Sequence, residues 1–155
     1  MRNSGIILSK IPKHSPIPFE LLLLADENVK SIDKYIFDCV IYAVIDNEKT
    51  IGVCAIQETN NDTIEIKNLA ILVKHRNCGI GSRCIQMIEE KYALKNVFVA
   101  TGDGSVDALR FYKRNGFKEY AVNKEYFLRN YDNPIVENGI LLKDQIVLKK
   151  TNHCD

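Results

Sequence analysis

The sequence predicts an α/β domain, and three observations support that fold class. An apolar run of strand length leads into a glycine-bearing turn and then into apolar residues at helical spacing. A second strand-like run is followed by another helical pattern, and two strand-like runs on either side of a polar turn are typical of a β-hairpin. The first pattern is the strand 69–73 with a helix over 79–93, and the second is the strand 97–100 with a helix over 106–114. The hairpin strands are 39–45 and 50–57.

The N-terminal part of the chain is expected to hold one strand and two helices. Residues 6–11 form the first strand, and three prolines then interrupt regular structure. A leucine run gives a short helix over 19–25 its packing face. Asn28 or Ser31 is a suitable cap for a second helix that ends at Phe37. These two helices therefore precede the hairpin.

The C-terminal half is expected to add one capped helix and further strands. Ser105 precedes the helix over 106–114 and is expected to cap it with its hydroxyl. Gly116 is expected to close that helix in a left-handed conformation. The remaining predicted strands are 63–73 in the centre of the sheet, 117–122 and 141–149.

Size, charge and cysteine usage narrow the class of protein. The 155 residues, 46% of them hydrophobic, are expected to form one domain over 1–155. A net charge of +1 gives no reason to expect a nucleic-acid or membrane partner. The five cysteines are odd in number and lack metal-ligand spacing, so we expect no metal site and a reducing, cytoplasmic location. Whether the chain forms a homodimer stays open.

The turn before the helix over 79–93 has the chemistry of an anion site. A helix N-terminus carries unpartnered N–H groups and partial positive charge, and Gly79 and Gly81 let a ligand approach the backbone closely. A plain turn is the alternative. Two known phosphate motifs are excluded: no Lys follows Gly81 as in a P-loop, and Cys84 stands where the dinucleotide fingerprint requires glycine.

Two motifs in sequence order resemble the GNAT superfamily of acetyl-CoA-dependent N-acetyltransferases. Arg76-x-x-Gly79-x-Gly81 follows an apolar strand and closely resembles motif A of that family. Further on, Ser105-x-x-Ala108-x-x-Phe111-Tyr112-x-x-x-Gly116-Phe117 is similar to motif B, with Ser105 in place of the usual Asn. The two motifs together span residues 64–117.

The resemblance implies a fold, a cosubstrate and a set of contacts. The GNAT fold has a central mixed, mostly antiparallel sheet of six to seven strands, flanked by about four helices, with acetyl-CoA in the cleft between strands four and five. The implied reaction moves the acetyl group to a primary amine of a small molecule by direct attack. The cofactor-binding residues implied for this chain are Leu69, Ile71, Val73, Arg76, Asn77, Cys78, Gly79, Ile80, Gly81, Ser82, Ser105, Ala108 and Tyr112.

Two side chains are catalytic candidates. Glu65 matches the position of the catalytic Glu in histone-type members, and a regular strand would place it on the same face as Ile71. The resemblance also implies that a bulge, which family members often carry in this strand, could reverse that face. A solvated Glu paired with Lys67, or a water chain in its stead, is the alternative. Tyr112 occupies the motif B position from which a phenol would protonate the leaving thiolate. A core tyrosine is the other interpretation of Tyr112.

The segment 123–139 is long for a loop in a compact domain, and such loops are often functional. Its aromatic residues Tyr126, Phe127 and Tyr131 are candidates for contact with the acceptor, or for covering the core. Two other functions stay open beside the small-molecule acetyltransferase: a catalytically silent acyl-CoA-binding sensor module, which the substitution at Ser105 favours, and a protein N-acetyltransferase.

Overall fold

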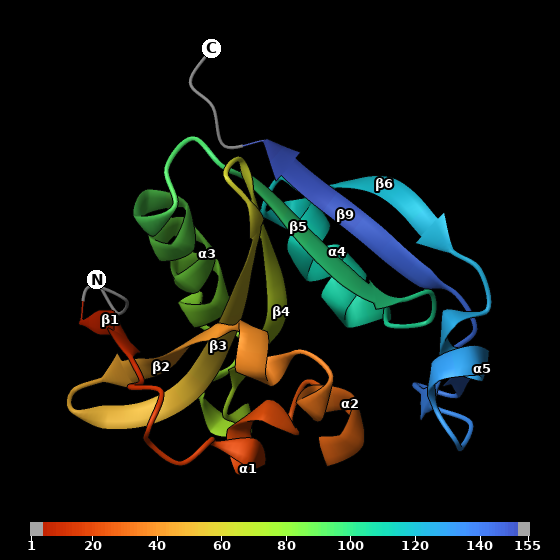
Figure 1. Ribbon diagram of the computed structural model, residues 1–155, viewed down its shortest axis with the longest axis horizontal. Helices are drawn as coiled ribbons and strands as arrows, with labels where there is room; N and C mark the ends of the chain where they lie inside the picture. The colour runs from red at the N-terminus through yellow and green to blue at the C-terminus, as the bar shows by residue number, and fades with distance from the viewer. Residues whose placement is uncertain (1–4, 152–155) are drawn as a thin grey trace.

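The structure, a computed structural model, describes residues 5–151 of the chain (Figure 1). Residues 1–4 and 152–155, which include Cys154, lie outside the described residues. The elements are β1 (Ile6–Lys10), α1 (Phe19–Leu22), α2 (Val29–Asp33), the 3-10 turn η1 (Ile36–Asp38), β2 (Val40–Asp46), β3 (Lys49–Asn60), β4 (Thr63–Ile71), the 3-10 turn η2 (Val73–His75), α3 (Ile80–Lys91), β5 (Asn96–Gly102), α4 (Val106–Arg114), β6 (Lys118–Asn123), α5 (Tyr126–Asn130), β7 (Val136–Glu137), β8 (Ile140–Leu141) and β9 (Gln145–Thr151).

Seven strands form one mixed sheet in the order β1-β2-β3-β4-β5-β9-β6. Every neighbouring pair is antiparallel except β4 and β5, which run parallel. The predicted fold class is therefore confirmed. The remaining two strands, β7 and β8, pair only with each other as a small hairpin.

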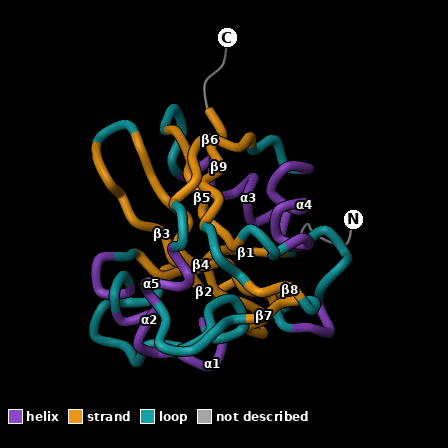
Figure 2. The backbone as a smooth tube through the Cα atoms, turned by 90° about the vertical axis from the view of Figure 1, so that its right-hand side faces the viewer, coloured by secondary structure: helices purple, strands orange, loops and turns teal. Residues whose placement is uncertain are grey.

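Helices cover the sheet on both faces (Figure 2). α3 and α4 lie on one face, where Cys84, Ile88 and Tyr112 join the buried side chains of the sheet in one apolar cluster. α1, α2 and η1 lie on the other face, where Leu22 and Ile32 pack in a second cluster. Cys39, Cys54 and Cys84 are buried in these clusters as small apolar residues.

β4 contains a bulge that changes which residues face which helices. Ala55 of β3 pairs with Asn68, and the next residue, Ile56, pairs with Ile66, so Lys67 is the extra residue in β4. A bulge of this kind reverses the alternation of side chains along the strand. Ile66 belongs to the α3–α4 cluster, whereas Ala70, also even-numbered, belongs to the α1–α2 cluster. The sequence-based placement of Glu65 on the face of Ile71 is therefore wrong.

β4 and β5 are paired only over their first residues. The parallel register runs from Thr63 with Asn96 to Ile66 with Val99 and then stops. Beyond this point the two strands diverge, as Figure 1 shows, while β4 stays paired with β3 and β5 with β9. Two strand edges without partners in the sheet therefore face each other across a wedge.

The N-terminal helices are shorter than the sequence suggested. α1 ends at Leu22 rather than Ala25. α2 ends at Asp33 rather than Phe37, which lies in the separate 3-10 turn η1. The Asn28 side chain caps α2 by accepting a 2.7 Å hydrogen bond from the Ser31 backbone N–H. The capping prediction is thus confirmed for Asn28.

The C-terminal segment departs most from expectation. Asn138 (φ 52°) and Gly139 (φ 77°) turn the chain between β7 and β8, as in the type I′ hairpins that favour Asn-Gly. The seventh strand of the sheet therefore begins at Gln145, not at Leu141. Leu142, buried at 2% exposure, inserts beside Gly102 instead of continuing a strand.

Candidate active site

A cavity of about 600 Å³ lies where β4 and β5 diverge. One end is lined by the turn before α3 and the first residues of that helix, and the other by the α1–α2 loop and the β7–β8 hairpin. The sequence-predicted cofactor residues that line it are Leu69, Ile71, Arg76, Asn77, Gly79, Ile80, Gly81, Ser82, Ser105, Ala108 and Tyr112. The fold thus brings both motifs to one cleft.

Val73 and Cys78 lie elsewhere. The sheet ends at Ile71, and Val73 begins the 3-10 turn η2 with its side chain 69% exposed. The Cys78 thiol donates a 3.0 Å hydrogen bond to the His75 carbonyl. Neither is among the residues that line the cavity, so the geometry gives no support to the cofactor contact predicted for them.

The turn before α3 is built for an anion. Asn77 (φ 62°) and Gly79 (φ 83°) adopt left-handed conformations, which Asn tolerates and Gly favours. Gly79 is the N-cap of α3 and no side chain caps the helix, so the backbone N–H groups of its first turn are open to a ligand. The Arg76 Nε donates a 2.8 Å hydrogen bond to the Ile71 carbonyl, which holds the guanidinium beside this turn.

Gly81 allows α3 and α4 to approach each other closely. A Cβ added at Gly81 would lie 3.0 Å from the ring of Phe111 in α4, tighter than ordinary packing. Both residues line the cavity. The second glycine of the motif therefore serves helix packing as well as ligand approach.

Tyr112 lies buried at the centre of the lining, with 7% exposure. Desolvation by burial, with a smaller contribution from Cys54 and Cys84, raises the pKa of its phenol, so the hydroxyl is protonated near neutral pH. Its ring packs edge-on against those of Phe111 and Phe117. A protonated phenol in the lining of the cavity can act as a proton donor.

Ser105 does not cap α4 with its hydroxyl, contrary to the sequence prediction. The Ser105 Oγ instead donates a 2.7 Å hydrogen bond to Oε2 of Glu137, in the β7–β8 hairpin. Ser105 is buried at 6% exposure and both residues line the cavity. The motif B serine therefore holds an acidic side chain in the cleft.

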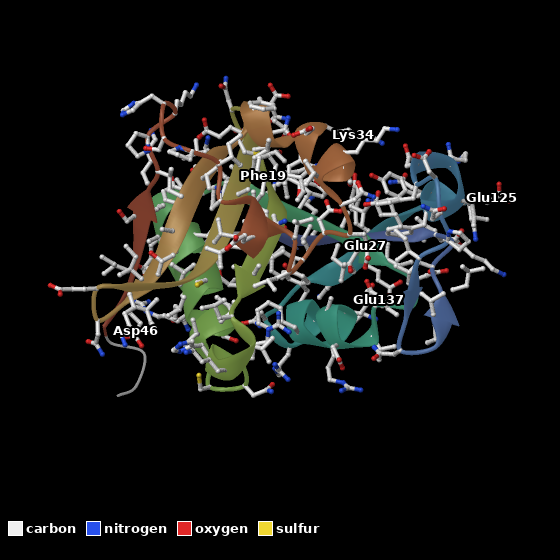
Figure 3. All side chains as sticks on the ribbon, turned by 90° about the horizontal axis from the view of Figure 1, so that it is seen from below. Phe19, Glu27, Lys34, Asp46, Glu125 and Glu137 are labelled. Atoms are coloured by element: carbon white, nitrogen blue, oxygen red, sulfur yellow. The ribbon has the colours of Figure 1, made fainter. Side chains whose placement is uncertain are left out.

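Glu27, Asn68 and Glu137 are among the lining residues at this end of the cleft that sequence reasoning missed. Figure 3 shows Glu27 and Glu137 close to each other although they come from separate segments. Desolvation raises the pKa of Glu27, and the negative charges of Glu137 and Asp26 raise it further. The Asn138-Gly139 turn signal would have brought Glu137 to attention, whereas no local pattern marks the bulge beside Asn68.

Glu65 is not among the residues that line the cavity. Its Oε2 lies 3.1 Å from Nζ of Lys67, and both side chains are three-quarters buried. Lys67, which does line the cavity, also lies over the Tyr35 ring. The catalytic role of Glu65 stays a prediction that this geometry does not support.

The aromatic residues of the segment 123–139 pack on one another. Phe127 stacks on Tyr131 and meets the Tyr126 ring edge-on. None of these three aromatic residues is among the described residues that line the cavity. From this segment, Glu137 and Asn138 line it instead. Direct contact of the aromatic side chains with an acceptor therefore stays a prediction without geometric support.

Tyr131 belongs to a hydrogen-bond network that is centred on Asp26. The Tyr131 hydroxyl donates to Oδ1 of Asp26, while those of Tyr35 and Ser31 donate to Oδ2. The Tyr35 hydroxyl in turn accepts from Nδ2 of Asn68. The network ties four separate segments together behind the acidic end of the cleft.

Comparison with known proteins decides the family. A family model for the acetyltransferase (GNAT) domain matches residues 38–119. The chain belongs to the GNAT acetyltransferase family. This GNAT protein is also 32% identical, over 133 residues, to the uncharacterized N-acetyltransferase YvbK of Bacillus subtilis (strain 168); the match covers 84% of this chain and 86% of that protein.

Two solved GNAT-type structures are similar over nearly their whole length. An acetyltransferase of Elizabethkingia anophelis with acetyl-CoA bound is 32% identical, with a TM-score of 0.88 and coverage of 96% of this chain and 99% of that one. An IAA acetyltransferase of Bacillus cereus ATCC 14579 is 33% identical, with a TM-score of 0.85 and coverage of 94% and 99%. As a GNAT member, the protein is an acetyl-CoA-dependent N-acetyltransferase.

The cleft residues of this GNAT protein fit acetyl-CoA. The uncapped α3 N-terminus and Arg76 suit the pyrophosphate, and the unpaired edges of β4 and β5 offer backbone groups to an extended pantetheine arm. Across residues 5–151, no helix has the length and apolar character needed to cross a membrane.

Proposed function

We propose that this GNAT protein acetylates the primary amine of a small molecule by direct attack on the thioester. The observation that supports it is the position of Tyr112, a buried phenol in the lining of the cleft. Acetyl-CoA supplies the acyl group. An acceptor enters at the end formed by the α1–α2 loop and the β7–β8 hairpin, and departure of the thiolate is assisted by the proton on Tyr112.

The chain's contribution is mainly orientation. The α3 turn fixes the donor at one end, and the carboxylates of Glu27 and Glu137 attract an ammonium at the other. The amine must lose a proton before it attacks. Glu27, whose pKa is raised by burial and by neighbouring carboxylates, lines the cleft and is better placed to accept that proton, directly or through water, than Glu65.

The two other functions are less well supported by the geometry. The presence of Ser105 in place of the family's usual Asn favoured a silent sensor module, but the Ser105 hydroxyl forms a hydrogen bond with Glu137. For a protein acetyltransferase, an extended peptide needs an open groove, whereas Glu137 and Asn138 of the β7–β8 hairpin line the acceptor end of this cleft.

Cys39, Cys54, Cys78 and Cys84 are free thiols, and we extend the proposal to a reducing, cytoplasmic setting.

The test is thiol release from acetyl-CoA in the presence of a mixed library of small amines, with products identified by mass spectrometry. We expect thiol release that depends on an amine and is absent without one. Calorimetry with acetyl-CoA runs beside it. Binding of acetyl-CoA without thiol release for any amine would overturn the proposed function in favour of the sensor module.

A further inference from the structure

The acceptor end of the cleft carries uncompensated negative charge. Within residues 5–151, neither Glu27 nor Glu137 forms an ion pair. The lysine that lines the same end, Lys67, is already paired with Glu65 at 3.1 Å. Among the described residues, the side-chain partner of Glu137 is the neutral hydroxyl of Ser105. Two carboxylates therefore line one cavity, and neither has an ion-pair partner among the described residues.

A second observation at the same end points independently to a ligand. Asn68 is 4% exposed and lines the cavity, yet its Oδ1 has no hydrogen-bond partner within the described residues. The amide cannot be turned over, because Nδ2 donates to the Leu22 carbonyl, which only accepts. Buried acceptors without a partner are rare and costly, so Oδ1 is suited to an N–H from a bound molecule.

The orientation of Asn68 is fixed by the surrounding network. Its Nδ2 also donates to the Tyr35 hydroxyl at 3.2 Å, and that hydroxyl donates to Asp26. Asp26 is held by Tyr131 from the segment 123–139. The Asn68 amide is therefore held in one orientation, with Oδ1 as its unpartnered atom, one residue beyond the bulge.

The charge balance determines the class of ligand. A monoamine brings at most one positive charge, which it loses when it is deprotonated for attack. A molecule with a second ammonium still holds a cation beside Glu137 after Glu27 has accepted the proton of the reacting amine. An amino acid would bring a carboxylate against two carboxylates, which is unfavourable.

We propose that the acceptor is a small aliphatic diamine or polyamine: its reacting amine donates an N–H to Asn68 Oδ1, and its second ammonium lies between Glu27 and Glu137. This inference rests on the proposed function and narrows its substrate class. It concerns only the acceptor end of the cleft. If it fails, the proposed binding of acetyl-CoA at the other end is unaffected.

The first experiment compares three acceptors of equal chain length: putrescine, butylamine and gamma-aminobutyrate. They differ only in whether the far end is cationic, apolar or anionic. We expect kcat/KM to be at least about tenfold higher for putrescine than for butylamine, equivalent to about 1.4 kcal/mol, and gamma-aminobutyrate to be the poorest. Equal values for putrescine and butylamine would overturn the inference and leave the proposed function standing.

The second experiment removes charge without changing shape. Glu137→Gln retains an oxygen that accepts from Ser105, and Glu27→Gln is its counterpart on the other segment. In each variant the putrescine-to-butylamine ratio of kcat/KM should fall at least severalfold. Glu125→Gln is the matched control, because Figure 3 shows Glu125 at the edge of the molecule, away from the pair, and its ratio should equal that of the wild type.

The last variant separates the two subsites. Asn68→Ala removes the acceptor of the reacting amine, so kcat/KM for putrescine and butylamine should fall together and their ratio should stay constant. Acetyl-CoA affinity by calorimetry confirms that the variant is folded. A ratio that is unchanged in both carboxylate variants, or acetylation of other amines but of no diamine in a series of varied length, would contradict the inference.

Discussion

The Ser105 Oγ and the Glu137 Oε2 lie 2.7 Å apart although the residues are separated by 32 positions. The bond joins the first residue before α4 to the β7–β8 hairpin, and therefore connects the acyl-transfer part of the cleft to its acceptor end. In the family pattern an Asn stands at this position. In this chain Ser105 stands there, and its hydroxyl holds the carboxylate of Glu137 in the lining.

Ser105→Ala should weaken the acceptor end and spare the donor end. Loss of a hydrogen bond to a charged group costs about 1.5–3 kcal/mol, and Glu137 would lose its fixed position. We expect a severalfold rise in KM for the amine and an acetyl-CoA affinity within about twofold of wild type. Ser105→Thr keeps the hydroxyl and is the control. A tenfold loss of acetyl-CoA affinity in the alanine variant would show instead that the hydroxyl contacts the cosubstrate.

Tyr112→Phe tests the proton donor. The substitution deletes one hydroxyl and keeps the ring contacts with Phe111 and Phe117. If the phenol protonates the departing thiolate, kcat should fall by about 10²–10⁴, with KM for acetyl-CoA nearly constant. A kcat within twofold of wild type would reduce Tyr112 to a core residue.

Gly81→Ala tests how the motif glycine acts. The new Cβ would press on the Phe111 ring at 3.0 Å, and it would also stand where the pyrophosphate approaches. We expect acetyl-CoA affinity to fall by about tenfold or more and the melting temperature to fall as well. In the double variant with Phe111→Leu, stability should recover while affinity stays low. Recovery of both would mean that Gly81 serves packing alone.

Glu65→Gln tests the role of the strand carboxylate. The substitution removes the partner of Lys67, so an unpaired cation is left beside the acceptor end. We expect KM for the amine to rise a few-fold while the acidic limb of the pH–rate profile keeps its shape. If that limb flattens and kcat falls, Glu65 is the base after all.

Glu27 should make stability depend on pH in a defined direction. Burial and the charges of Glu137 and Asp26 raise the pKa of its carboxyl in the folded protein. The folded state therefore holds the proton more tightly than the unfolded state, and stability is lost as pH rises through that raised pKa. The melting temperature of Glu27→Gln, relative to wild type, should be higher at pH 7 than at pH 4. A difference that is constant with pH would contradict the raised pKa.

The fold and the acetyl-CoA end were predictable because their signals are local. The apolar run, the Arg76-x-x-Gly79-x-Gly81 turn and the helical spacing after it are contiguous in sequence, and the structure reproduces them as β4, the left-handed turn and α3. The end of β4 at Ile71 was missed, because Leu72 and Val73 continue the apolar run although the backbone has already turned into η2.

The acceptor end could not be predicted in the same way. The single extra residue at Lys67 reverses the faces of β4, and no local pattern marks a bulge within an alternating strand. Asp26 and Tyr131 hydrogen-bond across 105 positions, which periodicity cannot reveal. The hairpin that carries Glu137 did have a local signal in Asn138-Gly139, but its flanking strands have only two residues each.

The division of the cleft between chain segments has an evolutionary consequence. The donor end is drawn from the continuous stretch 66–114, whereas the acceptor end adds two surface segments, 24–27 and 137–138. Such short surface segments tolerate insertion and exchange far better than the strands of the central sheet. A chimaera that receives both segments from another family member, and that preserves the hydrogen bond between Asp26 and Tyr131, would therefore prefer a different amine. It would still bind acetyl-CoA in the same way.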